Sequence, residues 1–452
     1  MREYPAEFLS RMQALLKEDF PRFIQTMDEE PFRALRVNTL KCDVEKFSKL
    51  SPFALRPTPF CKESFYLEPG ASDVGRHPYH HAGAYYVQEP SASSAAGLLE
   101  VQPGQKVLDL CAAPGGKSTQ LAAKLQRTGL LWSNELVAGR AKILLSNIER
   151  MGIPNAVVSS MHPDKLCERL PGFFDRVLVD APCSGEGMFR KEPAAIENWN
   201  AENVGMCAVR QGKILDSAAM ALRAGGLMVY STCTFSLEEN EQTIDSFLKS
   251  HPSFELVNID AAFGRPSDAS WMDSKQDLSR MRRIFPSDGG EGHFMAKLRR
   301  KDGEEAGCAP YILPKLQDET LVLEFLRDNF PEMDTARMVN LSGMVYSLPE
   351  MLPNLSGMNI LRAGMLCGRI KPGRFEPAHH LYTASTKEQA RQVLDLHADD
   401  PDIRRYLHGE VLKAPLQKGY AMVCVDGMSL GFGKVSGGVM KNHYPKGLRI
   451  LG

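Results

Sequence analysis

The stretch "VLDLCAAPGGKSTQLA", Val107 to Ala122, decides how the chain is folded. Its first residues are an apolar run of the kind that forms a buried strand, and "KSTQLA" opens a segment with helical periodicity. Between the two lie Cys, Ala, Pro and Gly, whose small side chains let a ligand approach the backbone at the amino end of a helix. The sequence therefore predicts a strand, a ligand-binding turn and a helix in succession.

The succession of apolar strand-like segments and helical segments continues on the C-terminal side of this stretch. Strand-like segments alternate with helical ones such as "AGRAKILLSNIERMG", and these strands read "GLLWSNEL", "NAVVSS", "RVLVDAP" and "GLMVYSTC". This alternation is typical of a parallel sheet with helices on both faces, in which ligands bind beyond the carboxyl ends of the strands. We predict an α/β fold with a Rossmann-like sheet.

Composition excludes several other classes of protein. The chain has 452 residues, of which 43% are hydrophobic and 24% charged, as in ordinary globular proteins. The opening "MREYPAEFLSRMQAL" lacks the apolar core of a signal peptide, and no stretch has the length of a membrane span. We expect a cytoplasmic protein without a membrane partner.

The ten cysteines are irregularly spaced and form no CxxC pair or zinc pattern. We therefore expect no metal and no disulfide framework. Most of these thiols are predicted to be small buried hydrophobes, namely Cys42, Cys61, Cys167, Cys207, Cys308, Cys367 and Cys424.

The two ends of the chain differ from its centre. The first ninety residues mix a helical opening with strand-like pieces such as "ALRVNTL", and Glu68 to Leu99 is punctuated by Gly, Pro and Ser like a linker or lid. Its "HPYHH", His77 to His81, either touches RNA or packs a turn. After Arg300, "RRKDGEEAG" indicates a domain boundary, and short strands with Gly turns near the C-terminus indicate a small β-rich domain.

Charge is distributed unevenly along the chain. The formal net charge is −1, yet from Leu361 onward fourteen Lys/Arg face eight Asp/Glu, a local +6. Basic residues there are interleaved with Tyr, Phe and His, a composition that suits phosphate contact and base stacking. The alternative is a basic surface on a structural domain that binds nothing.

The turn after the first strand favours one kind of cofactor. It contains neither the GxGxxG dinucleotide fingerprint nor the GxxxxGK[ST] phosphate loop. Glu135 ends the second strand, where a carboxylate accepts hydrogen bonds from a ribose diol. A turn and an acid in this relation fit a nucleoside without a triphosphate, which points to S-adenosylmethionine.

Two cysteines stand where two further strands end. "VDAPCSG" carries Asp180 and Cys183, and "YSTCTF" carries Cys233. Adjacent parallel strands would bring both thiols beside the cofactor turn, where helix amino termini lower the pKa of a thiol. Methylating carbon 5 of a pyrimidine requires a thiolate at carbon 6, a carboxyl group near N3 and a second group that assists release. Two thiols and one aspartate match that requirement.

Two other functions were compared with this one. An RNA-binding assembly factor without activity would not need either thiol, and both are present. A methyltransferase acting on exocyclic amino groups typically carries Asp/Asn-Pro-Pro-aromatic after the fourth strand, whereas "DAPCSG" lacks the aromatic residue. We expect an enzyme that forms a covalent bond to a pyrimidine.

These motifs resemble those of the NOP/Sun family of RNA cytosine-C5 methyltransferases, and most closely its bacterial group acting on 16S ribosomal RNA. The resemblance covers roughly residues 30–300. It rests on "LRVNT", "YYVQEPSAS", "CAAPGGKSTQLA", "SNELVAGRAKILLSNIERMG", "DRVLVDAPCSGEGMFRKEP", "YSTCTFSLEENE" and "GHFMAKL".

The resemblance implies a role for each matching residue. Cys233 would attack carbon 6, Cys183 would help to break the adduct, and Asp180 would lie between the methyl donor and the base. DNA cytosine-C5 methyltransferases use the PC-motif cysteine as nucleophile, so "STC" separates the two arrangements. Lys191 would contact RNA. The cofactor would be held by Cys111, Ala112, Ala113, Pro114, Gly115, Gly116, Lys117, Glu135, Arg140 and Asp180.

One position departs from the family pattern. The family has an acidic residue after the third strand, near the adenine amino group, and His162 occupies that place here in "VVSSMHPDKL". Either Asp164 or a main-chain carbonyl would then serve the adenine.

The resemblance also implies the domains and partners. These are an N-terminal α+β lid domain that contacts RNA (1–90), the catalytic methyltransferase domain (91–302), an intermediate C-terminal domain or linker (303–385) and a β-rich PUA-like RNA-binding domain (386–452). The expected partner is 16S ribosomal RNA within the 30S subunit, and the expected state is a monomer.

Overall fold

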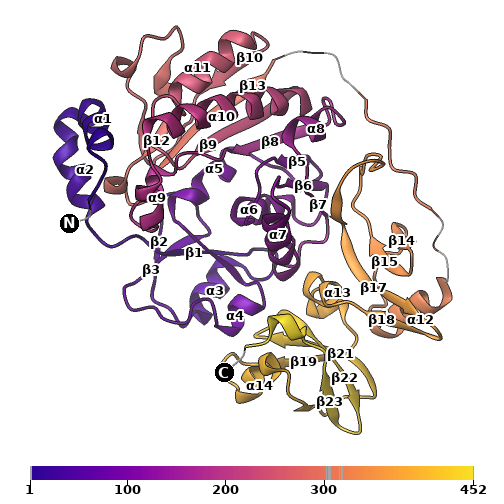
Figure 1. Cartoon of the computed structure of the whole chain (residues 1–452). Coiled ribbons are helices and arrows are strands. Elements are labelled where there is room, and N and C mark those ends of the chain that lie inside the picture. The colour runs from indigo at the N-terminus through magenta and orange to yellow at the C-terminus, as the bar shows by residue number, and fades with distance from the viewer. Residues whose placement is uncertain (1–2, 302, 304–306, 315, 317–318, 451–452) are drawn as a thin grey trace.

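A mixed sheet of ten strands forms the centre of the molecule (Figure 1). The structure is a computed structural model that describes residues 3–301, 303, 307–314, 316 and 319–450. The strand order is β11-β12-β13-β9-β8-β5-β6-β7-β16, and β10 pairs with β13. The strands are β5 (Lys106–Asp109), β6 (Leu130–Asn134), β7 (Ala156–Ser159), β8 (Phe174–Asp180), β9 (Leu222–Thr232), β10 (Phe254–Val257), β11 (Arg265–Pro266), β12 (Arg282–Ile284), β13 (His293–Arg300) and β16 (Ile360–Ala363).

The direction of the strands identifies where a ligand binds. β7, β6, β5, β8 and β9 are mutually parallel, as the sequence predicts, and the flanking strands run antiparallel. The chain proceeds outward from β5 to β7 and then returns to β8 on the other side of β5. This reversal places the switch point of the sheet between β5 and β8, the usual binding crevice of an open α/β sheet.

Alternate residues of each parallel strand enter two separate cores. Val107, Leu131 and Val158 pack beneath α5, α6 and α7. Leu108, Trp132 and Val157 pack on the opposite face with α8, α10 and α11. Burial on both faces explains why these strands read as unbroken apolar runs. The helices are α5 (Ser94–Gly97), α6 (Gly116–Leu125), α7 (Ala138–Arg150), α8 (Pro163–Cys167), α9 (Pro193–Glu197), α10 (Ala201–Ala221) and α11 (Glu241–Ser250).

The N-terminal part of the chain is a helix pair followed by a small sheet. The sheet has the order β2-β3-β1-β4. The linker predicted for the stretch from Glu68 to Leu99 is wrong, because "YYVQ" within it is strand β4, which pairs with β1. Gly and Pro there mark turns around a short helix. The elements are α1 (Ala6–Leu16), α2 (Phe20–Met27), α3 (Val44–Leu50), α4 (Pro78–His81), β1 (Ala34–Val37), β2 (Leu55–Pro57), β3 (Ser64–Leu67) and β4 (Tyr85–Gln88).

Two further sheets complete the C-terminal side, which is orange to yellow in Figure 1. A four-stranded sheet has the order β14-β15-β17-β18, and a five-stranded sheet has the order β19-β21-β22-β23-β20, so the predicted β-rich end is confirmed. Part of the boundary expected in "RRKDGEEAG" lies outside the described residues. The elements are α12 (Glu319–Asn329), α13 (His379–Ala384), α14 (Pro401–His408), β14 (Met338–Leu341), β15 (Met344–Ser347), β17 (Met365–Lys371), β18 (Arg374–Pro377), β19 (Val393–Leu396), β20 (Leu412–Lys413), β21 (Gly419–Val425), β22 (Met428–Ser436) and β23 (Val439–Asn442).

The two ends of the chain share one hydrophobic core. Leu35 and Phe47 of the N-terminal part lie in the same cluster as Leu407 and Val435 of the C-terminal part. Lys41 crosses this seam and donates to Ser429 Oγ at 2.7 Å. The N-terminal and C-terminal sheets therefore brace each other through apolar contact as well as polar bonds.

The histidines of "HPYHH" pack at this seam. His81 Nδ1 lies 3.0 Å from the Tyr444 hydroxyl, and the His77 ring stands edge-on to Phe53. Of the two interpretations of this motif, the structure supports the packing one.

The sequence predicts no membrane-spanning segment. Across the described ranges, no helix combines the length and apolar character needed to cross a membrane.

Candidate active site

The loop between β5 and α6 is held from outside by three hydrogen bonds to its backbone. Ala112 N donates to Asn134 O at 2.8 Å, Arg140 Nη2 donates to Ala113 O at 2.9 Å, and Asn147 Nδ2 donates to Pro114 O at 2.9 Å. The peptide bond before Pro114 is cis. The loop thus keeps its shape without using the inner surface that faces the strand ends.

Gly115 is required by the geometry of this turn. Its φ of +115° is one that residues with side chains rarely adopt, and an added Cβ would lie 3.2 Å from Leu144 Cδ1. At Gly116, a Cβ would lie 3.3 Å from Gln88 Nε2. The two glycines therefore allow α6 to begin directly beneath the N-terminal sheet.

A residue of the N-terminal sheet supports the loop from the other side. Arg36 is 1% exposed, and its Nη2 donates to Gly116 O and to Thr119 Oγ1, each at 2.7 Å. Its Nε donates to Gln88 Oε1 at 3.1 Å. The first domain thus fixes the conformation of the turn, a function that sequence analysis missed because "LRVNT" gave no sign of its partner.

Two carboxylates stand at the ends of β5 and β6. Asp109 accepts from Ser118 Oγ at 2.7 Å through Oδ2, while its buried Oδ1 has no hydrogen-bond partner among the described residues. Burial raises the pKa of Asp109 to about 7. Glu135 accepts from Val137 N at 2.9 Å and lies 3.3 Å from Arg140 Nη1.

A nucleoside cofactor fits this arrangement. The turn has no side chain larger than proline between Cys111 and Lys117, so the backbone is open to close approach. A buried carboxylate follows the second strand, and Asp109 keeps an unpaired oxygen beneath the turn. These features match a ligand that carries hydroxyl and amino donors without phosphates.

The two predicted thiols meet at the carboxyl edge of the sheet. Because β8 and β9 pair in parallel with Asp180 beside Ser231, the loops that follow them run side by side. Cys183 Sγ lies 3.3 Å from Cys233 Sγ. The hydrogen bond with Cys233, together with burial, holds the pKa of Cys183 well above its ordinary value. The lowering by a helix terminus that we expected is therefore wrong for Cys183.

Asp180, the last residue of β8, is fixed beside these thiols. Lys117 Nζ donates to its Oδ2 and Ser231 Oγ to its Oδ1, each at 2.7 Å. Burial by itself would raise the pKa of Asp180, but the charge and hydrogen bond of Lys117, with smaller contributions from His293 and the Ser231 hydrogen bond, together outweigh burial, and the pKa lies below its usual value. The same contact raises the pKa of Lys117 despite its burial. Asp180 is thus a carboxylate held in one orientation.

A buried layer holds the loop of Cys183 from behind. Glu239 Oε2 accepts from Ser184 N at 3.0 Å and from Gln211 Nε2 at 2.8 Å, and Gln211 also donates to Pro182 O at 3.0 Å. Burial raises the pKa of Glu239 to about 7. The motif "EENE" does not reveal this function in the sequence, because nothing in it indicates which strand end it contacts.

The departure near the adenine position has a local structure of its own. The Asp164 carboxylate lies 2.6 Å from His162 Nδ1, on the surface. Ser160, just before them, exchanges two hydrogen bonds with Asn359, each at 3.0 Å. A residue from the C-terminal part of the chain therefore borders the segment that follows β7.

The remaining cysteines follow the prediction in part. All ten are free, and five of the seven predicted hydrophobes are buried. Cys61 and Cys308 are only half-buried, so the prediction is wrong for these two.

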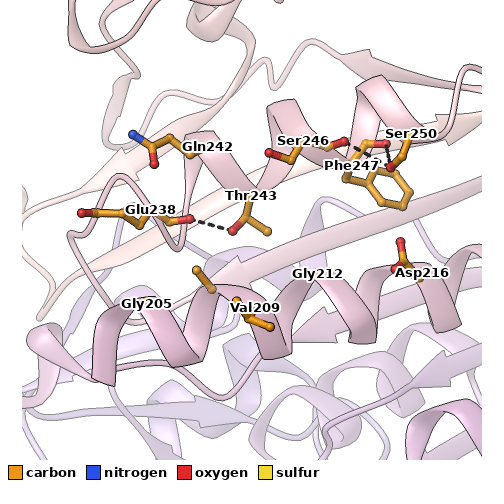
Figure 2. A pocket seen from close by; sticks show the side chains of 11 residues that line it. Gly205, Val209, Gly212, Asp216, Glu238, Gln242, Thr243, Ser246, Phe247 and Ser250 are labelled. Carbon is orange, nitrogen blue, oxygen red and sulfur yellow. Dashed lines mark hydrogen bonds between the residues drawn. The ribbon is translucent and has the colours of Figure 1, made fainter. Parts of the chain in front are cut away.

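A surface groove lies apart from the strand ends. Figure 2 shows it between α10 and α11, with Val209 and Gly212 on one wall and Thr243 and Ser246 on the other. It contains none of the predicted site residues. The predicted site residues therefore lie outside this groove.

The fold and this site define a Rossmann-like methyltransferase. Family models match four consecutive parts of the chain. They are the N-terminal domain of 16S rRNA methyltransferase RsmF (residues 4–90), 16S rRNA methyltransferase RsmB/F (96–299), the RsmF rRNA methyltransferase first C-terminal domain (324–384) and the methyltransferase RsmF PUA domain (393–450).

Curated relatives match over nearly the whole chain. Ribosomal RNA small subunit methyltransferase F of Erwinia tasmaniensis is 31% identical over 98% of this chain and 96% of its own length. The protein of the same name from Vibrio vulnificus is 31% identical over 98% and 97%. The chain belongs to the ribosomal RNA small subunit methyltransferase F family, and the resemblance found in its motifs is confirmed.

Solved structures share the fold of about two thirds of the chain. A methyltransferase homolog protein from Pyrococcus horikoshii is 29% identical with a TM-score of 0.59, covering 66% of this chain and 95% of that one. NSun6 from Pyrococcus horikoshii is 22% identical with a TM-score of 0.58, and it shares the fold over 66% of this chain and 99% of its own.

Proposed function

We propose that this protein transfers the methyl group of S-adenosylmethionine to carbon 5 of a cytosine in 16S ribosomal RNA of the small subunit. The observation that carries the proposal is the contact of Cys183 and Cys233, 3.3 Å apart, beside a fixed Asp180. Methyl transfer to an oxygen or an amino group needs no thiol. Two thiols in contact at the binding edge support chemistry that forms and then breaks a carbon–sulfur bond.

The residues divide the reaction between them. The Cys233 thiolate adds to carbon 6 of the base, which makes carbon 5 nucleophilic. N3 of the base takes up a proton from water, which offsets the charge that the thiolate brings, and Asp180, kept ionised by Lys117, accepts a hydrogen bond from this protonated edge. Once carbon 5 carries the methyl group, its proton passes to water, the electron pair of that C–H bond restores the double bond between carbons 5 and 6, and the bond from carbon 6 to sulfur breaks so that Cys233 leaves as a thiolate. Cys183 touches the departing sulfur and assists that step.

The cofactor residues act by shape and hydrogen bonding. The backbone from Cys111 to Gly116 would enclose the methionine and ribose portions, with Lys117 at the end of the turn. Glu135 would accept from the ribose hydroxyls, and Arg140 would hold both Glu135 and the turn in place. S-adenosylmethionine supplies an electrophilic methyl group on a sulfonium centre when it is bound there.

RNA binding is assigned to the C-terminal sheets and to Lys191. The exposed Lys434 lies over the Tyr420 ring with its Nζ 5.0 Å from the centroid, and Lys441 is exposed on the neighbouring strand β23. Ammonium groups beside an aromatic face suit phosphate contact and base stacking. We further infer that the enzyme acts as a cytoplasmic monomer on the RNA within the 30S subunit.

The first experiment assigns the two thiols. Small subunits from cells that lack the enzyme are incubated with methyl-labelled S-adenosylmethionine and wild type, Cys233→Ala or Cys183→Ala. We expect Cys233→Ala to be inactive and free of adduct, and Cys183→Ala to accumulate protein–RNA adduct on denaturing gels. An adduct-free Cys183→Ala would reverse the two roles. A wild-type protein that labels no RNA would favour the RNA-binding assembly factor without activity.

The second experiment tests RNA recognition without truncating the chain. A deletion starting at Leu361 would cut β16 out of the central sheet, so point variants are needed. The double variant Lys434→Glu with Lys441→Glu should weaken RNA binding. The slope of the logarithm of the binding constant against the logarithm of the salt concentration should become shallower by about 0.7–0.9 per lysine. The matched control reverses Lys49 and Lys165, which are 74% and 64% exposed and pair with neighbouring glutamates. Equal weakening by both pairs would exclude a localised RNA surface.

A further inference from the structure

His293 occupies a position that no part of the proposed reaction has yet used. It is the first residue of β13, and its neighbour Phe294 pairs with Thr232 of β9. The next position along β9 is Cys233. The antiparallel register therefore places His293 opposite the nucleophile, at the same edge of the sheet as Asp180.

The hydrogen-bonding capacity of His293 is unfilled. The residue is 3% exposed, and both ring nitrogens are buried without a hydrogen-bond partner in the described part of the chain. Its Nε2 lies 3.7 Å from Asp180 Oδ1, beyond hydrogen-bond distance. Buried polar groups in native proteins almost always have a partner, so this pair of unfilled nitrogens indicates a ligand.

Nearby residues that could have filled this capacity already have partners. Lys117 donates to Asp180 at 2.7 Å. Glu89, from the N-terminal sheet, accepts from Ser91 N at 2.8 Å and from Glu291 N at 2.9 Å. Of the groups beside His293, Asp180 comes nearest, and it lies beyond hydrogen-bond distance of the ring.

The imidazole in this site is neutral. Burial, reinforced by the charge of Lys117, lowers the pKa of His293 to about 4. A neutral imidazole offers one N–H donor and one acceptor nitrogen, whereas the Asp180 carboxylate only accepts. Together they present one donor and several acceptors to a bound group.

We propose that His293 is a specificity-determining residue that contacts the Watson–Crick edge of the target cytosine alongside Asp180. The inference rests on the proposed function. Cytosine presents an amino donor at carbon 4 and acceptors at N3 and O2, which complement an acceptor carboxylate and an N–H donor. Uracil carries an acceptor oxygen at carbon 4 and an N–H donor at N3, the reverse of cytosine, so Asp180 and His293 disfavour it. A base flipped into an enzyme is commonly recognised through this edge.

The test uses variants that separate hydrogen bonding from packing. His293→Phe fills the volume without polar atoms, and His293→Asn keeps one donor and one acceptor. Met295→Leu, two residues further on the same buried strand, is the matched control. Melting temperature and S-adenosylhomocysteine binding verify that each variant is folded and retains its cofactor site.

The readout is base discrimination as well as rate. Small-subunit RNA is transcribed in two forms, one with 5-fluorocytidine and one with 5-fluorouridine after the methylated cytosine, mapped first with wild type, has been changed to uridine. In both forms the fluorine on carbon 5 of the target base cannot leave as a proton and so traps the adduct. We expect wild type and Met295→Leu to trap only the fluorocytidine RNA. His293→Phe should lose about 10–100-fold in kcat/KM and most of its preference for cytosine, and His293→Asn should recover part of both.

Each outcome bears on a different claim. If His293→Phe keeps kcat/KM within threefold and still rejects fluorouridine, the inference on His293 is overturned and the proposed function stands. If it loses activity with S-adenosylhomocysteine binding or melting temperature reduced in proportion, His293 is a packing residue. If wild type traps neither RNA and methylates none, the proposed function fails and takes the inference with it.

Discussion

Replacing Arg283 by methionine should destabilise the catalytic domain by about 3–5 kcal/mol, the usual cost of removing one partner from a buried ion pair. Arg283 Nε and Nη2 donate to the two oxygens of Glu241 at 2.7 and 2.5 Å, and its Nη1 donates to Phe235 O at 2.6 Å. The side chains are 2% and 0% exposed. The pair thus ties β12 and the start of α11 to the loop that carries Cys233.

The magnitude follows from what the substitution leaves behind. Without Arg283, Glu241 keeps Ser267 Oγ, at 2.6 Å, as its hydrogen-bond donor, and the Phe235 carbonyl loses the guanidinium donor. The cost is then an unpaired buried charge plus an unpaired carbonyl, and solvent offsets neither. With a urea m-value of about 2.5 kcal/mol/M, the unfolding midpoint should fall by about 1–2 M.

The assay is urea unfolding of the full chain followed by hydrogen exchange of peptides from β9, β12 and α11. Arg299→Met is the matched control, because its partner Glu255 is 3.8 Å away and both side chains are about half exposed. A surface pair of this kind contributes at most about 1 kcal/mol. Exchange should accelerate in the loop of Cys233 for Arg283→Met alone.

A double variant separates the pair from general loss of packing. Glu241→Met with Arg283→Met removes both charges, so its cost should be less than the sum of the two single costs by at least about 2 kcal/mol. Additive costs would refute the reasoning. An Arg283→Met unfolding midpoint within about 0.3 M of wild type, as small a shift as that expected for the control, would refute it as well.

Three further predictions concern other parts of the molecule. Because their sulfurs are already in contact, diamide should oxidise Cys183 and Cys233 to a disulfide and abolish methylation, and reduction should restore it. If both thiols still react with an alkylating reagent after diamide treatment, the prediction is wrong. Acid should loosen the packing of α4 and α13, because burial lowers the pKa of His80, His379 and His380 to about 3 and that of His81 to about 4. The unfolded histidines bind protons near pH 6.5 and the folded ones do not, so stability is full above pH 6.5 and falls toward pH 4, by up to about 1.4 kcal/mol per pH unit for each histidine. A melting temperature unchanged between pH 7 and 5 would count against it. Arg36→Leu should weaken binding of S-adenosylhomocysteine by about tenfold, which corresponds to one to two lost hydrogen bonds on the loop, and Arg36→Lys should weaken it less. The affinity is measured by calorimetry, and an unchanged affinity would show that the turn holds its shape without Arg36.

The catalytic sheet could be predicted from sequence because local patterns there coincide with the global fold. Each parallel strand is buried on both faces and reads as an apolar run, and each functional turn follows such a run. Cys183, Cys233 and Asp180 lie at strand ends, so strand adjacency alone brings them together. Glu135 and the turn from Cys111 to Lys117 follow by the same argument.

What could not be predicted depends on contacts between distant segments. His293 begins an antiparallel strand, and only the register of β13 on β9 brings it to the site. Arg36 reaches the cofactor turn from eighty residues away, and Asn359 reaches Ser160 from the C-terminal part. No local periodicity encodes such pairings. For the same reason β4 was hidden in a stretch rich in Gly and Pro.

The position of β16 at the edge of the central sheet affects how the protein folds while it is being synthesised. The catalytic strands are complete at Arg300, but β7 acquires its outer partner only when Ile360–Ala363 has been synthesised. At roughly 5–20 residues per second, the nascent protein spends several seconds with a bare sheet edge. Edges of this kind recruit other chains. A ribosome that stops between these two points would release a protein that has every catalytic residue and an open template for aggregation.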